Sequence, residues 1–183
     1  DRYRAVAAYN EAVVEAVGVE SGVGPLRAAP SFGTVPGNHR GRPGDGAAPA
    51  KTGADLVAAV PGLTDHATVS AREVCAQPGF DVRWRDVIAT AGAVRAAAED
   101  GADGVVVTHG TDTLADTAYA LNLLTDLSVP VVVTGAQRRL DEPSSDAPAN
   151  LTLAVRAAAD ERFGPGVHVA FDDELHAARD VVK

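Results

Sequence analysis

Three short apolar runs constrain this chain more than any other feature. They are GVVVT at residues 104–108, PVVVT at 130–134 and GVHVAF at 166–171. Short runs rich in β-branched residues are typical of strands that are covered on both faces. Segments of helical periodicity separate them, at residues 113–124 and 148–162. Because parallel neighbours need such crossovers, the sequence predicts an α/β fold: a parallel, Rossmann-like sheet with helices on both faces.

The segments before the first run extend this alternation. Residues 54–60 and 86–99 place apolar side chains on one side of a helix, and residues 67–74 alternate like a half-buried strand. Residues 1–17 carry apolar side chains at a three-to-four spacing, which predicts an amphipathic helix.

Residues 22–50 have a different composition. They are dense in Gly, Pro and Arg, so we expect a loop or disordered linker with poor order over residues 36–50. The chain is therefore expected to divide into an atypical N-terminal helix and Gly/Pro/Arg-rich loop at residues 1–50 and an α/β domain at residues 51–183.

Charge and composition exclude several classes of function. The net charge is -9, with 25 acidic against 16 basic side chains, which argues against a nucleic-acid surface. No long uncharged apolar run is present, so we expect a soluble protein without a membrane partner. The single cysteine, Cys75, permits no internal disulfide and favours a cytoplasmic protein.

The stretch THGTDT follows the first apolar run. Ligands of such sheets bind beyond the carboxyl ends of the strands, and the N-terminus of the next helix favours a carboxylate there. A helix cap could explain Thr111 or Asp112, but a cap needs only one such residue. Thr108 and Thr113 add further hydroxyls within six positions. A ligand site is therefore favoured over capping alone.

A threonine hydroxyl needs a base or cation beside it to act as a nucleophile. Thr111, Asp112 and Lys183 form a candidate triad, although Lys183 could equally be an exposed residue. The acidic residues 172–174 could suggest a cation, but a solvated turn is favoured. His176 and Cys75 are expected to be structural.

Several motifs together resemble the bacterial-type L-asparaginase and glutaminase family. They are KTGADLVAAVPGL, GVVVTHGTDTLADTAYAL, PVVVTGAQRR, SSDAPANL and DDELHAARDVVK, in the family's order and over about residues 51–183. The resemblance implies the N-terminal domain of an asparaginase-type fold, without the C-terminal domain. It implies no metal or organic cofactor.

The resemblance also implies roles for individual residues. Thr111 would activate water or the nucleophile, Asp112 would bind the α-amino group of the substrate, and Lys183 would complete the Thr-Lys-Asp set. Further substrate-binding positions would be Gly110, Gly135, Ala136 and Asp81. Asp146 and Asn150 would brace a loop and the start of a helix.

The sequence departs from the family near its start. Thr34, in SFGTV, aligns only loosely with the usual nucleophile, and no apolar strand is expected before it because two prolines precede it. The lid tyrosine is missing, and Gly79 and Phe80 occupy the family's Ser and Gln positions. We expect a truncated domain that hydrolyses asparagine poorly.

The resemblance implies an L-asparaginase-type amidohydrolase that converts L-asparagine and water to L-aspartate and ammonia through a threonine acyl-enzyme. Asparagine would be the small-molecule substrate, with glutamine as the alternative, and the full-length protein would be a homodimer or homotetramer. Two other interpretations are the amidase subunit of glutamyl-tRNA(Gln) amidotransferase and a catalytically inactive asparaginase-like fragment.

Overall fold

The three apolar runs form neighbouring strands at the centre of the molecule. The computed structural model describes residues 13–18, 30–32, 53–75, 79–138, 140 and 142–182. Within it, β4 (Gly104–Thr108), β5 (Pro130–Thr134) and β6 (Gly166–Phe171) pair in parallel, as predicted. Every residue of β4 and β5 is buried, which explains why both strands are apolar without alternation.

Four more strands complete a seven-stranded sheet of order β2-β3-β1-β4-β5-β6-β7. They are β1 (Val13–Gly18), β2 (Pro30–Phe32), β3 (Ala67–Cys75) and β7 (Glu174–Ala177). β1 runs antiparallel to both β3 and β4, and β7 runs antiparallel to β6. The expected α/β class is confirmed, with a parallel centre in a mixed sheet.

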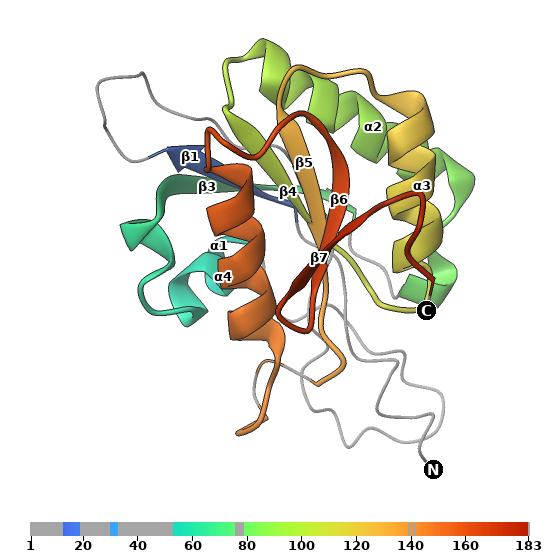
Figure 1. Ribbon diagram of the computed structural model, residues 1–183. Helices are drawn as coiled ribbons and strands as arrows, with labels where there is room; N and C mark the ends of the chain where they lie inside the picture. Colours follow the sequence, from blue (N-terminus) through green and yellow to red (C-terminus); the bar gives the residue numbers. More distant parts are fainter. Residues whose placement is uncertain are drawn as a thin grey trace.

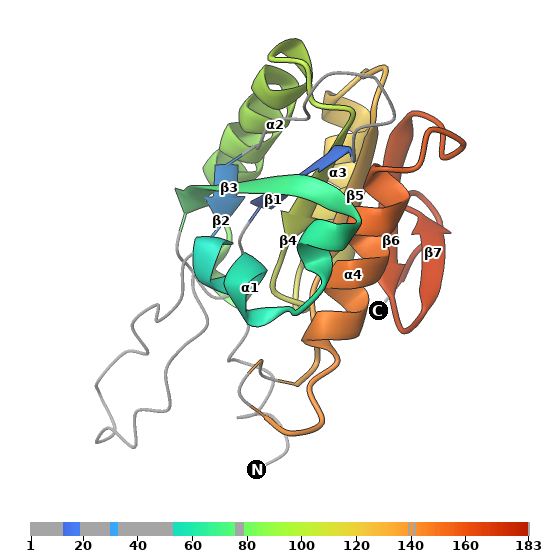
Figure 2. The ribbon, with the colours of Figure 1, turned by 90° about the vertical axis from the view of Figure 1, so that its left-hand side faces the viewer.

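Helices cover both faces of the sheet, as Figures 1 and 2 show. α1 (Gly53–Ala59) and α4 (Ala147–Ala158) lie on one face, and α2 (Trp84–Glu99) and α3 (Leu114–Leu124) lie on the other. Two short 3-10 turns, η3 (Leu63–Asp65) and η4 (Gly79–Asp81), join these layers to the sheet. The helices predicted at residues 54–60, 86–99 and 113–124 are confirmed to within about two residues at their ends.

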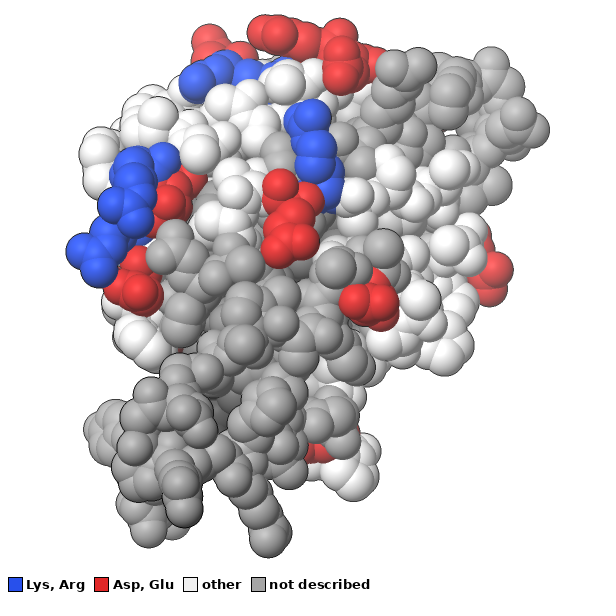
Figure 3. Space-filling model, turned by 180° about the vertical axis from the view of Figure 1, so that it is seen from behind, with Lys and Arg blue, Asp and Glu red and all other residues white. Residues whose placement is uncertain are grey.

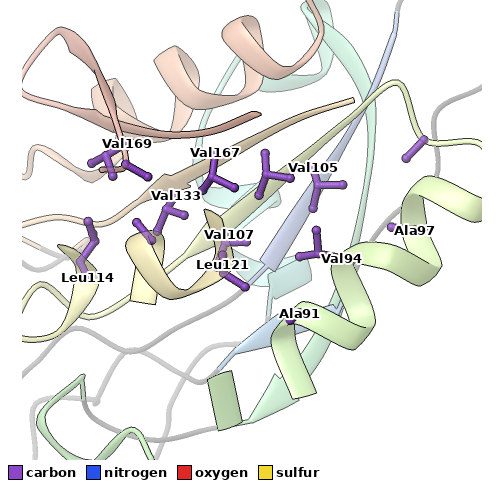
Figure 4. Packing of buried hydrophobic residues seen from close by; sticks show 14 residues of the cluster. Ala91, Val94, Ala97, Val105, Val107, Leu114, Leu121, Val133, Val167 and Val169 are labelled. Atoms are coloured by element: carbon purple, nitrogen blue, oxygen red, sulfur yellow. The ribbon is translucent and has the colours of Figure 1, made fainter. Parts of the chain in front are cut away.

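Each face of the sheet has its own apolar core. The core under α2 and α3 is shown in Figure 4, where valines from three strands meet side chains of both helices. It includes Val94, Val105, Val107, Leu121, Val133 and Val167. The opposite core includes Leu56, Leu63, Val106, Val132, Leu151 and Val155. Successive valines of β4 therefore point to opposite cores, and burial of each contributes on the order of 1.5 kcal/mol or more.

The N-terminal helix prediction is wrong for residues 13–17, which belong to strand β1. Val13 pairs with Arg72 of β3 and with Val107 of β4. The three-to-four spacing of apolar residues fits a helix, but the β-branched valines fit a pleated sheet better, and two partner strands decide the outcome. Residues 1–12 lie outside the described part of the chain.

The loop prediction for residues 22–50 is wrong for Pro30–Phe32, which forms β2 beside β3. The expectation that no strand precedes Thr34 is therefore also wrong. Proline begins this strand and lies at the edge of the sheet, a position that tolerates its missing N–H. Residues 36–50, expected to be poorly ordered, lie outside the described residues.

Two differences concern the C-terminal part. The helix expected over residues 148–162 ends at Ala158, after which residues 159–165 lead to β6. The expected solvated turn at Asp172 and Asp173 is confirmed, but it also opens strand β7, which was not predicted. A two-residue connection can join only antiparallel strands, which accounts for the reversed direction of β7.

On the face seen in Figure 3, the charged side chains of the described residues form small groups rather than one continuous patch. In Figure 3 the basic side chains are few and separate, and each lies beside an acidic one. No helix in the described ranges is long and apolar enough to cross a membrane. Nor do the described residues contain a group of three or more His, Cys, Asp and Glu side chains placed to hold a metal ion.

Candidate functional site

The THGTDT loop leaves the sheet at the carboxyl end of β4. The His109 N–H still donates to the Thr134 carbonyl of β5 at 2.7 Å, so the parallel ladder extends one residue beyond the strand. Thr111 follows with only 3% of its surface exposed, whereas Asp112 is exposed. The loop thus turns one buried hydroxyl and one exposed carboxylate toward the edge of the sheet that sequence analysis predicted as the site.

His109 is a buried, neutral part of this loop. The residue is 2% exposed, and its Nδ1 lies 2.8 Å from the Gly110 carbonyl oxygen. Burial lowers the pKa of His109 to about 4, although the hydrogen bond to the Gly110 carbonyl opposes this shift. A carbonyl oxygen only accepts hydrogen bonds, so Nδ1 carries the proton of the neutral ring. At neutral pH His109 therefore holds the shape of the loop and carries no charge.

Turn η4 packs directly against the same loop. The Thr113 hydroxyl donates to the Gly79 carbonyl at 2.7 Å. A Cβ built on Gly79 would lie 3.0 Å from the backbone of Gly110, so the two backbones approach as closely as glycines permit. Asp81, a predicted substrate-binding residue, instead pairs with the exposed Arg83 at 2.8 Å and does not line the pockets beside Thr111 and Asp112.

The loop after β5 contacts Thr111 from the other side. A Cβ built on Gly135 would lie 2.4 Å from the His109 carbonyl oxygen and 3.4 Å from the Thr111 methyl group. Ala136 is buried, with 2% of its surface exposed. The structure therefore brings three of the predicted positions, Thr111, Gly135 and Gly110, into one packed cluster.

An open cavity of about 580 Å³ lies beside Thr111. Gln137 from the loop after β5 and Asp172 from the β6–β7 turn share its lining with Thr111, while Val169 and Phe171 supply apolar wall. The carboxyl ends of three neighbouring parallel strands thus meet at one cavity, as the topology requires. Gln137 was not predicted as a site residue, although it lies within the motif PVVVTGAQRR.

Asp112 lines a second, adjoining pocket. Ala115, Val181 and Val182 border both pockets, so Thr111 and Asp112 face neighbouring spaces along the start of α3. Lys183 follows Val182 directly in the sequence but lies outside the described residues, as does Thr34. The predicted convergence of Thr111, Asp112 and Lys183 therefore stays a prediction.

The start of α4 braces the wall of the cavity. Both carboxylate oxygens of Asp146 accept backbone N–H groups of the loop after β5, from Gln137 at 2.9 Å and from Arg138 at 2.8 Å. Asn150, 2% exposed, donates to the Gly135 carbonyl at 2.9 Å and accepts from the Asp172 N–H at 3.1 Å. The expectation that Asp146 and Asn150 brace a loop and a helix start is confirmed.

Comparison with known proteins was consistent with this geometry. A family model described as the asparaginase N-terminal domain matches residues 33–183. The chain is 47% identical over 127 residues to a subunit of the glutamyl-tRNA(Gln) amidotransferase of Methanothermobacter thermautotrophicus, covering 68% of this chain and 29% of that protein. It is 40% identical over 129 residues to a probable periplasmic L-asparaginase of Haemophilus influenzae, covering 70% of this chain and 37% of that protein.

A solved structure has the same fold. The crystal structure of a probable cytoplasmic L-asparaginase from Campylobacter jejuni superposes with a TM-score of 0.68 and 37% sequence identity, covering 70% of this chain and 41% of that one. The chain spans about a third of the length of the curated relatives it matches.

Proposed function

The chain belongs to the asparaginase family, whose N-terminal domain it matches, and we propose that it serves as the catalytic domain of an L-asparaginase-type amidohydrolase. The observation that carries this proposal is the buried Thr111 at the carboxyl end of β4, on the wall of an open cavity beside the N-terminus of α3. Relatives named as L-asparaginases support the reaction type.

The proposed reaction proceeds in two steps. A threonine hydroxyl attacks the side-chain amide carbonyl of asparagine, a C–O bond forms, the C–N bond breaks, and the protonated nitrogen leaves as ammonia. Water then cleaves the resulting ester, which restores the hydroxyl and releases aspartate. We assign attack to Thr34, and activation to Thr111 with Lys183.

Substrate binding is assigned to the edge around α3. The exposed Asp112 carboxylate would pair with the α-amino group of the substrate. The first N–H groups of α3 would favour its carboxylate, since Thr117 is the first residue to donate a helical bond, to Thr113. Backbone groups of Gly110, Gly135 and Ala136 would contact the amide. Asp81, in turn η4, would be a further substrate-binding residue.

The test compares Thr111→Val with Thr125→Val. Thr125 donates its hydroxyl to Leu121 at the opposite end of α3, so its variant loses a threonine hydroxyl far from the cavity. Ammonia release from L-asparagine is measured by a coupled assay, and L-aspartate binding is measured by amide NMR shifts. We expect Thr111→Val to lose about 100-fold or more of the turnover and Thr125→Val to lose little. Wild-type protein that neither binds aspartate nor releases ammonia would refute the proposal.

A second candidate function is the amidase subunit of a glutamyl-tRNA(Gln) amidotransferase. Relatives named as part of that enzyme match this chain at 39–47% identity. The same assay separates the two functions. An asparaginase releases ammonia from the free amino acid alone, whereas an amidase of the second kind is expected to need its tRNA-bound partner for coupled turnover and to accept glutamine.

A further inference from the structure

Asn150 joins two loops that line the Thr111 cavity but are far apart in the sequence. Its side-chain amide donates to the Gly135 carbonyl at 2.9 Å and to an Asp146 carboxylate oxygen at 3.3 Å. Its carbonyl oxygen accepts the Asp172 N–H at 3.1 Å. One buried carboxamide thus satisfies groups on the loop after β5, on the start of α4 and on the β6–β7 turn.

Both segments that Asn150 reaches need external support. Asp172 and Asp173 hold φ angles of 52° and 63°, in the left-handed region that side chains other than Gly enter at a cost. The loop after β5 has its Gln137 and Arg138 N–H groups bound to Asp146 rather than to a strand partner. Asp146 in turn makes no side-chain cap to its own helix, so its carboxylate serves the loop.

We propose that Asn150 is a positioning residue for the Thr111 cavity, which fixes the loop after β5 and the β6–β7 turn relative to each other. Gln137 and Asp172 line that cavity with Thr111, so movement of either segment changes its shape. The effect on hydrolysis rests on the amidohydrolase function proposed above, whereas the coupling of the two segments does not.

Two variants and one control test the proposal. Asn150→Leu removes all three hydrogen bonds at similar volume. Asn150→Asp keeps the acceptor for the Asp172 N–H but replaces the donor by a carboxylate, which would repel the Asp146 carboxylate. Thr152→Val is the control, because the Thr152 hydroxyl bonds within α4, to the Pro148 carbonyl at 2.7 Å.

Amide hydrogen exchange followed by NMR reads the coupling directly. In Asn150→Leu we expect the Asp172, Gln137 and Arg138 amides to exchange on the order of 10-fold to 100-fold faster, while β5 amides keep their protection. In Asn150→Asp we expect faster exchange at Gln137 and Arg138 but not at Asp172. Thr152→Val is expected to change none of these three amides.

Lowering the pH should restore slow amide exchange in Asn150→Asp, which a purely structural effect of the substitution would not show. Burial and the nearby Asp146 would raise the pKa of the carboxyl introduced by Asn150→Asp, and its protonated form can again donate a hydrogen bond. Exchange at Gln137 and Arg138, corrected for the intrinsic pH dependence, should return toward the wild-type value as the pH is lowered. The turnover of the wild-type protein and both variants adds a kinetic readout, with an expected fall of about 10-fold to 100-fold in kcat and a smaller change in KM for Asn150→Leu.

Unchanged exchange in Asn150→Leu would overturn the proposal, as would an equal increase at β5 amides, which would indicate global destabilisation. An unaltered kcat in a variant whose loops exchange faster would overturn the catalytic part. Wild-type protein that neither binds L-aspartate nor releases ammonia would refute the amidohydrolase function and that catalytic part together, and exchange alone would then decide the coupling.

Discussion

The buried neutral His109 makes stability depend on pH in a defined window. Its pKa is lowered from 6.5 to about 4 by burial, so between these values the unfolded chain binds a proton that the folded chain does not. As the pH falls, protonation of His109 therefore stabilises the unfolded state but not the folded state. The contribution of His109 to stability is complete above pH 6.5 and decreases as the pH is lowered toward 4.

The magnitude follows from the two pKa values. Between about pH 7.5 and about pH 5, a group with pKa 6.5 unfolded and about 4 folded changes the free energy of unfolding by about 2 kcal/mol. Carboxylates with ordinary pKa values remain mostly ionised at pH 5, so this interval reports mainly on histidines. His168, whose pKa burial also lowers, contributes in the same direction.

The assay is urea denaturation at both pH values, for wild type and His109→Asn. Asparagine retains an N–H donor near the position of Nδ1 and does not titrate in this range. The variant is expected to be less stable at pH 7.5 because of lost packing, but to lose about 2 kcal/mol less than wild type on acidification. Because all other histidines remain, the difference isolates His109. Equal losses in the two proteins would refute the assignment of a buried, neutral ring.

Three further substitutions test close contacts and the hairpin turn. Gly104→Ala would place a Cβ 2.0 Å from the Ala158 carbonyl oxygen, so α4 must shift, and thermal denaturation should show a loss of about 1–3 kcal/mol. Gly135→Ala would meet the His109 carbonyl at 2.4 Å, so it should reduce ammonia release more than it reduces Tm, since the displaced loop lines the site. Asp173→Gly relieves a φ of 63° and should raise Tm by about 1–4 °C, and an unchanged or lower Tm would contradict the strained turn.

The local pattern of apolar residues was sufficient to predict a strand where burial and periodicity indicate the same element. The valine runs of β4 and β5 lie under helices on both faces, and short β-branched runs are typical of such strands. For the valines of β1 the two signals conflict, because their spacing fits a helix and their β-branched side chains fit a strand. Pairing with β3 and β4 settled that choice, and those partners lie about 50 or more residues away.

The location of the site could be predicted from the topology of the sheet, but the elements and contacts that form its walls could not. Parallel strands place Thr108, Thr134 and Phe171 at one edge, so THGTDT could be assigned to the cavity before any contact was known. Strand β7 was missed because its turn has two aspartates instead of the glycine that usually marks a tight hairpin.

The need of buried polar groups for hydrogen-bond partners explains why the sequence indicated that Asp146 and Asn150 brace the site but not which groups they bind. A buried carboxamide needs partners for two donors and an acceptor, and the partners of Asn150 lie 15, 4 and 22 residues away in the sequence. SSDAPANL therefore identifies a helix start without showing which loops it holds.

Once the fold is known, the same need for hydrogen-bond partners shows which loops are coupled. The Gly135 carbonyl and the Asp172 N–H share Asn150 as a partner, so the two loops cannot be displaced independently without leaving a buried polar group unpaired. That energetic penalty couples the walls of the cavity in the chain itself, whichever amide proves to be its substrate.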